Sequence, residues 1–112
     1  MTDGLDLIND IQDLTAALSR AVRSLATQGR DYAEKEAEYK VRLMQESLKL
    51  RDSGMPVTLI DKVVYGIVAE ERRERDVAEA FYKASQENIN AIKLRLRLVN
   101  SQIEREWGRR TP

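Results

Sequence analysis

The sequence of 112 residues contains no cysteine and no histidine. Their absence excludes disulfides, thiol nucleophiles, Ser-His-Asp triads, Cys/His zinc sites and imidazole acid–base chemistry together. Nineteen basic residues balance nineteen acidic ones, which excludes a uniformly basic nucleic-acid-binding protein. No apolar run is long enough to span a bilayer, and the N-terminus lacks the features of a signal peptide. We therefore expect a cytoplasmic, non-enzymatic protein with no catalytic residue, metal site, cofactor or membrane contact.

Proline and glycine are also scarce, with two and five copies, and aromatic residues make up 5% of the chain. Many Ala, Leu, Glu, Arg and Lys residues with few helix breakers are typical of long helices. The one dense turn signal, Ser53–Pro56, lies near the midpoint. We expect a single all-α domain, 1–112, that forms a long antiparallel, coiled-coil-like helical hairpin. Its predicted parts are a helix over about 5–52, a turn at 53–58, a short helix over 59–65, a long helix over about 67–107 and a frayed tail at 108–112.

An apolar stripe with helical spacing runs through the first half of the chain. Its members are Leu7, Ile11, Leu14, Leu18, Val22, Leu25, Tyr32, Tyr39, Leu43 and Leu50. Gly54 then suits the position just after a helix, where a positive φ costs glycine nothing. Gly29 lies within the stripe, and it indicates either a close approach of two helices or a break in the first one.

A second stripe begins after Thr58 and Asp61, which together resemble an N-terminal capping box. Its members are Ile60, Val63, Val64, Ile67, Val77, Phe81, Ile92, Leu96, Val99 and Ile103, with Trp107 as a further candidate. Gly66 interrupts this stripe early and predicts the end of the short helix. Ile89, Leu94 and Leu98 lie off the stripe and widen it.

Folding the two halves back about the turn brings residue i close to residue 111 − i, and charges agree with this register. Two acidic groups should then face basic groups across the hairpin. Glu34, Glu36 and Glu38 face Arg72, Arg73 and Arg75, while Asp6, Asp10 and Asp13 lie near Arg105, Arg97 and Lys93.

Two helices alone cannot bury both stripes well, because each helix has only one neighbour. We expect a homo-oligomer, a dimer or larger, that assembles into a multi-helix bundle. The alternative is that breaks at Gly29 and Gly66 let the chain form a compact monomeric four-helix bundle.

Two groups of residues are candidates for binding. The first, for a protein partner, combines the apolar turn residues Met55, Val57 and Leu59 with Arg72, Arg73 and Arg75. Packing of the turn and a solvated charged helix are the alternatives for these residues. The second, for nucleic acid or an anionic nucleotide held between subunits, is Lys93, Arg97 and Arg105. Ion pairing with the N-terminal aspartates is the alternative there.

Four segments of the second half carry a resemblance to known proteins. They are Gly54–Ile60 with Gly66, Asp76–Tyr82, Ile89–Lys93 and Ile103–Trp107. The chain resembles small proteins of bacteriophages and prophages, mostly from Gram-positive bacteria, for which no activity is known. The resemblance implies a phage gene of the early or recombination region, and it implies no site residues. It favours an interaction protein with a host or phage partner, with a DNA-metabolism accessory protein or a nucleotide-sequestering protein as alternatives.

Overall fold

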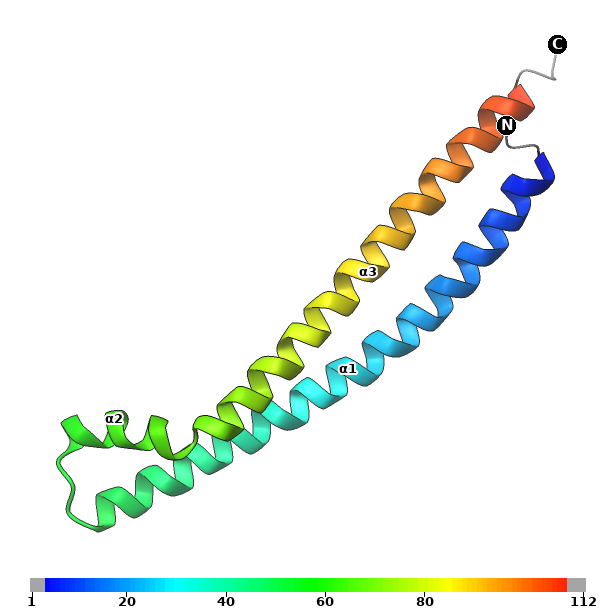
Figure 1. The fold of residues 1–112 in the computed structure, drawn as a ribbon. Coiled ribbons are helices and arrows are strands. Elements are labelled where there is room, and N and C mark those ends of the chain that lie inside the picture. Colours follow the sequence, from blue (N-terminus) through cyan, green and yellow to red (C-terminus); the bar gives the residue numbers. More distant parts are fainter. Residues whose placement is uncertain (1–3, 109–112) are drawn as a thin grey trace. The chain divides into compact units, whose positions relative to one another are not determined.

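The computed structural model describes residues 4–108, and three helices account for nearly all of them (Figure 1). They are α1 (Gly4–Asp52), α2 (Val57–Ile67) and α3 (Ala69–Gly108), and the described part of the chain contains no strand. The predicted all-α helical hairpin is confirmed. Gly108 belongs to α3, and the rest of the predicted tail lies outside the described residues.

The contacts of the chain form two compact units rather than one continuous cluster. Unit 1 pairs the first part of α1, up to residue 26, with the part of α3 from residue 84 onward. Unit 2 is Thr27–Lys83, which holds the rest of α1, the turn, α2 and the start of α3. Within each unit the α1 and α3 segments run in opposite directions.

Unit 1 has an apolar seam with alternating spacings of three and four residues, as in a coiled coil. Ala21, Ile89 and Ile92 are buried at its centre. The partly buried residues around them are Leu14, Ala17, Leu18, Leu25 and Leu96. The same spacing continues toward the helix ends with Leu7 and Ile11 on α1 and Val99 and Ile103 on α3. Burial of apolar surface therefore holds this unit together.

Unit 2 keeps the seam spacing but fills it with polar and aromatic side chains. On α1 the seam positions are Gln28, Tyr32, Lys35, Tyr39, Arg42 and Glu46, and Leu43 and Leu50 beside them are partly buried. On α3 they include Glu71, Arg75, Ala78 and Tyr82. Polar residues at seam positions specify register at some cost in stability. Ile60, Val64 and Val68 supply buried apolar packing in this unit, while the polar seam positions set the register of α1 against α3.

Several residues that we predicted on the apolar stripes are exposed instead. They are Val22, Val63, Ile67, Val77, Phe81 and Trp107. Ala21, Ala78 and Tyr82, each one residue away from one of these, occupy the seam. The prediction that Ile89 lies off the stripe is also wrong, because its side chain is 7% exposed. Position in the seam therefore determines burial more than side-chain hydrophobicity does. An alanine at a seam position is buried, whereas a valine next to it in the sequence is exposed.

The turn has the predicted glycine conformation but a different helix start. Gly54 has φ +87°, and the Met55 amide donates to the Leu50 carbonyl at 3.2 Å, which closes the end of α1. The short helix begins at Val57 rather than residue 59. Pro56 precedes it with no side-chain cap, and its carbonyl accepts from the amides of Leu59 and Ile60. The predicted capping box is therefore wrong, since Thr58 already lies inside the helix.

The junction between α2 and α3 lies at Val68 and not at Gly66. Gly66 is inside α2, while Val68 leaves the helical region with φ −100° and ψ 18°. Backbone hydrogen bonds continue across the junction, from the Val68 amide to Val64 and from the Arg72 amide to Val68, both at 3.0 Å. Val68 is fully buried, so packing of its side chain fixes the bend.

Gly29 lies where α1 closely approaches Tyr82 of α3, which is one of the two interpretations that the sequence allowed. α1 is continuous through it, and a Cβ built on Gly29 would lie 3.1 Å from Cε1 of Tyr82. The predicted break at Gly29 is wrong, and with it the compact four-helix monomer. The ring of Tyr82 also contacts that of Tyr32, with centroids 5.9 Å apart.

Candidate protein-docking site

Helix α2 exposes five apolar residues, although only two of its residues are buried. Those two are Ile60 and Val64. The exposed apolar residues of the same helix are Val57, Leu59, Val63, Tyr65 and Ile67. Thr58, Asp61 and Lys62 lie on one side of this helix, and the exposed apolar residues beside them offer surface that a partner would cover.

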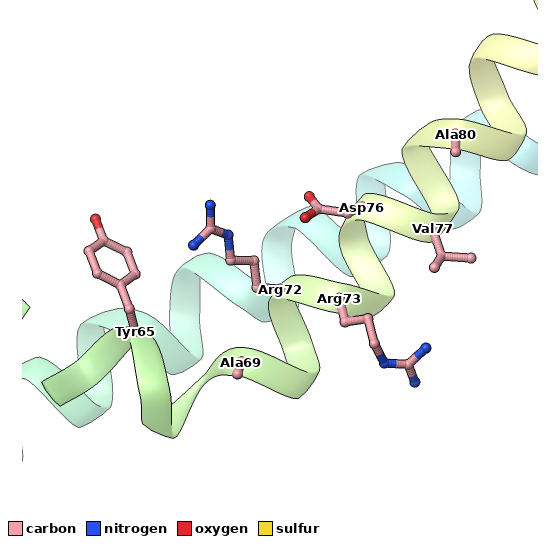
Figure 2. Close-up of a pocket in the computed structure, with 7 residues that line it drawn as sticks. All are labelled: Tyr65, Ala69, Arg72, Arg73, Asp76, Val77 and Ala80. Carbon is pink, nitrogen blue, oxygen red and sulfur yellow. The ribbon is translucent and has the colours of Figure 1, made fainter. Parts of the chain in front are cut away.

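A groove begins on α2 and continues along the start of α3 (Figure 2). Its lining residues are Tyr65, Ala69, Arg72, Arg73, Asp76, Val77 and Ala80. In Figure 2 the side chains of Tyr65, Arg72 and Asp76 extend to one side, and those of Arg73 and Val77 extend to the other. Ala69 and Ala80 have small side chains, so the space between these two groups of larger side chains stays open. The groove is a shallow, largely apolar surface with charged edges.

Tyr65 and Arg72 form one edge of this groove together. The guanidinium carbon of Arg72 lies 5.8 Å from the centroid of the Tyr65 ring, within the range of a cation–π contact. The ring is itself exposed, and so is the arginine. The pair therefore presents a flat apolar face next to a positive charge.

Arg73 and Glu70 are bound to each other beside the opposite edge. Arg73 donates from Nε and Nη2 to the two carboxylate oxygens of Glu70, at 3.1 and 2.5 Å. These hydrogen bonds lower the pKa of Glu70 and raise that of Arg73. Both side chains are well exposed, so the pair orients the guanidinium more than it stabilises the fold.

Arg75 does not belong to this surface, which corrects our prediction. Its guanidinium carbon lies 4.5 Å from the ring centroid of Tyr39 on α1, and its side chain is only 22% exposed. It also donates to Asp76, a hydrogen bond that raises the pKa of Arg75. Arg75 therefore acts inside the hairpin seam of unit 2.

The turn residues differ from one another in exposure. Val57 is 75% exposed and Leu59 is also exposed, whereas Met55 is partly buried. Val57 and Leu59 lie on α2 with Tyr65, so the predicted turn surface and the groove share one helix. The sequence reasoning missed Tyr65, Ala69, Val77 and Ala80 as lining residues. The apolar composition of 57–67 could have indicated Tyr65, whereas no sequence signal pointed to the other three.

The charged groups of unit 2 pair mainly within their own helices, which is not what we predicted. Glu36 pairs with Lys40 and Glu38 with Lys35 on α1, at 3.5 and 3.9 Å. The ion pair between helices joins Arg42 Nε to Glu71 Oε1 at 3.5 Å. That distance is too long for a good hydrogen bond, and the buried Nε atom has no other acceptor. Opposite charges do meet across the hairpin, but through residues outside the predicted blocks.

The alternative anion-binding residues lie on α3 in unit 1 and line none of its described grooves. Lys93, Arg97 and Arg105 are exposed, and Arg105 donates to the Ser101 carbonyl of its own helix at 3.3 Å. The groove that contains Asp10 and Asp13 has Arg95 as its basic residue, not Lys93 or Arg97. The predicted proximity of these aspartates to Arg97 and Lys93 stays a prediction.

Other classes of site are limited by what the helices offer. Within residues 4–108, acidic side chains do not gather into a group that could hold a metal ion. No helix in that range combines the length and apolarity needed to cross a membrane. No protein-family model, curated protein or solved structure matches this chain.

Proposed function

We propose that this chain is a non-enzymatic, self-associating interaction protein that binds a helix of another protein in the groove on α2 and α3. The observation that carries the proposal is the imbalance on α2, which buries two apolar residues and exposes five. An exposed apolar patch of this kind on a short helix marks an interaction surface. Tyr65, one of these five residues, also lines the groove, which continues along α3.

The chemistry of the groove favours an amphipathic partner helix with acidic residues along its edge. Tyr65 and Val77 offer apolar contacts, and the two alanines allow a helix to approach closely. Arg72 and Arg73 extend on opposite sides of the groove, where each could pair with a carboxylate of the partner. Asp76 on the same rim as Arg72 disfavours a partner with acidic residues along both edges.

The setting of the proposed interaction comes from the sequence resemblance alone. A phage or prophage gene implies that the protein acts in the cytoplasm of the bacterial host cell. Its partner would then be a host protein or another phage protein. A rigid helical surface that requires no cofactor is sufficient for such a role, since binding by itself alters what the partner does.

Site-specific photo-crosslinking tests the proposal. A photo-reactive residue at position 80, which also lines the groove, should crosslink one other protein in a lysate of the bacterial host, and adding Val77→Asp or Arg73→Glu should abolish its capture. Leu94→Asp is the matched control, because Leu94 is also an exposed apolar residue of α3 and lies outside the groove. Circular dichroism should show unchanged helix content in all three variants. Capture that persists in Val77→Asp and Arg73→Glu would contradict the docking site.

A further inference from the structure

The outer face of α1 in unit 2 carries a second apolar seam. Its four residues, called here the outer seam, are Ala37, Val41, Met44 and Leu48. All four are exposed, Met44 most strongly with 67% of its surface accessible. At 100° per residue they point roughly opposite to Tyr39 and Glu46, which are buried against the rest of the unit. α1 is therefore apolar on a face that the chain itself leaves uncovered.

The outer seam has the spacing of a coiled-coil interface. Its residues follow one another at intervals of four, three and four. Positions opposite to a buried seam are normally charged, because they face water. The apolar run is bounded by Glu34 before Ala37 and by Arg51 after Leu48, both on the same face and both exposed. Among the ion pairs of residues 4–108, neither Glu34 nor Arg51 takes part.

The accessible surface of the chain leaves ample area for a partner. It is 8454 Å² in total. A standard protein interface takes about 800 Å² from each partner. We propose that a second copy of this chain covers the outer seam, with the two α1 helices antiparallel about a two-fold axis. The inference rests on the self-association in the proposed function and names the face that mediates it.

Residue size and charge select one register for this dimer. When the two helices pair at positions whose residue numbers add to 85, the small Ala37 meets the large Leu48 of the second copy. Val41 meets Met44, and Glu34 meets Arg51 at each end of the seam. The two-fold axis repeats every contact, so two ion pairs close the ends of the apolar seam. Both charges find in the second copy an ion-pair partner that residues 4–108 of their own chain do not provide.

A parallel dimer would lack this match. It would place Glu34 against Glu34 and Arg51 against Arg51, so like charges would meet at seam positions. The antiparallel arrangement brings the two Lys40 side chains near each other, and likewise Glu38 near Asp52. Lys40 is already paired with Glu36 and Glu38 with Lys35 in the same helix, which weakens that repulsion. The balance favours the antiparallel dimer.

Charge reversal with light scattering and sedimentation equilibrium tests the face and the register. The wild-type chain should be a dimer, and Glu34→Arg or Arg51→Glu alone should raise its dissociation constant at least tenfold. The double variant Glu34→Arg/Arg51→Glu should return it to within about threefold of wild type, because the pair is re-formed with its signs exchanged. Val41→Asp should give a monomer with unchanged helix content, and Leu94→Asp should stay a dimer.

The remaining outcomes each contradict a different statement. A wild-type monomer at millimolar concentration would overturn both the dimer and the self-association in the proposed function. An oligomer that Val41→Asp leaves intact would overturn the outer seam as its interface and leave the self-association standing. Single reversals that weaken the dimer without rescue in the double variant would overturn the antiparallel register. A different protein crosslinked at position 44, with no crosslink between copies, would assign this face to another partner and overturn the inference.

Discussion

Arg75 of α3 lies over the ring of Tyr39 of α1, with its guanidinium carbon 4.5 Å from the ring centroid. Tyr39 is 6% exposed and sits at a seam position where a coiled coil normally has an aliphatic residue. The contact joins the two arms of unit 2 in one register, since shifting either helix by a turn would remove the ring from beneath the cation. The structure of unit 2 thus depends on matched pairs of this kind.

Truncating Tyr39 should therefore destabilise the chain strongly. Tyr39→Ala removes a buried ring and the cation–π contact, and we expect a loss of about 3 kcal/mol in the free energy of unfolding. Tyr39→Phe keeps the ring and should cost less than about 0.5 kcal/mol. Urea denaturation at one fixed protein concentration measures both. A loss in Tyr39→Phe as large as in Tyr39→Ala would show that the hydroxyl, not the ring, is what matters.

Substitution by alanine should change the stability of the chain in opposite directions at Gly54 in the turn and at Gly66 in α2. Gly54 has φ +87°, so Gly54→Ala should destabilise the chain by about 1 kcal/mol. Gly66 lies inside α2 with no atom within 4 Å of an added Cβ, so Gly66→Ala should stabilise it by up to about 1 kcal/mol. Thermal or urea unfolding of the two variants gives the signs. A destabilised Gly66→Ala would mean that α2 must bend at this position.

Gly29→Ala should raise the free energy of unfolding by less than its position inside a helix alone suggests. The added Cβ would lie 3.1 Å from Tyr82, and the nearby ring of Tyr32 limits how far Tyr82 can move. In the Tyr82→Ala background the obstacle is gone, so Gly29→Ala should there yield the full stabilisation of about 1 kcal/mol. A double-mutant cycle measured by urea denaturation checks this. Equal effects in both backgrounds would show that Tyr82 adapts without cost.

The sequence was sufficient to predict the helices, the turn at Gly54 and the antiparallel pairing. It was not sufficient to predict which residues fill the seam, because the apolar stripe is interrupted in unit 2 by Lys35, Arg42 and Glu46. Following apolar residues alone leads to Val77 and Phe81, whereas the seam spacing leads to Ala78 and Tyr82. Val77 then becomes part of an exposed groove, which explains why that groove could not be predicted from hydrophobicity.

The pH dependence of Glu70 should report its pairing with Arg73. The hydrogen bonds from Arg73 lower the pKa of this carboxyl in the folded state. The pair therefore stabilises the fold at pH values above the usual pKa of a glutamate. This contribution is lost as the pH falls through the lowered pKa of Glu70. In an NMR titration, Arg73→Gln should raise the midpoint of Glu70, and Arg72→Gln should leave it unchanged. A midpoint that does not move in Arg73→Gln would contradict the pair.

The polar residues in the seam of unit 2 should make the fold less stable than apolar residues at the same positions would. Glu46 is nearly buried and binds both Arg42 and Lys49 at 3.2 Å, while Arg42 Nε lies buried without a well-placed acceptor. Replacing a fully buried ion pair by apolar residues of similar volume is often stabilising by about 1–4 kcal/mol, and the gain here should be smaller because the Arg42 side chain is 43% exposed. Arg42→Leu/Glu46→Leu should therefore raise the free energy of unfolding, measured in urea at fixed protein concentration. Arg42→Leu alone should lower it by about 1 kcal/mol, because Glu46 then loses one of its two cations.

The same double variant should lose register specificity while it gains stability. Leucines at both positions can pack against α3 in more than one alignment, whereas Arg42 has Glu71 within 3.5 Å in only the observed one. Amide NMR spectra should then show extra or broadened signals for unit 2, with those of residues 4–26 unchanged. A single sharp set of NMR signals would mean that Tyr39 and Arg75 suffice to hold the register. A double variant that is less stable in urea would mean that the Arg42–Glu46 pair has a net stabilising effect on the seam.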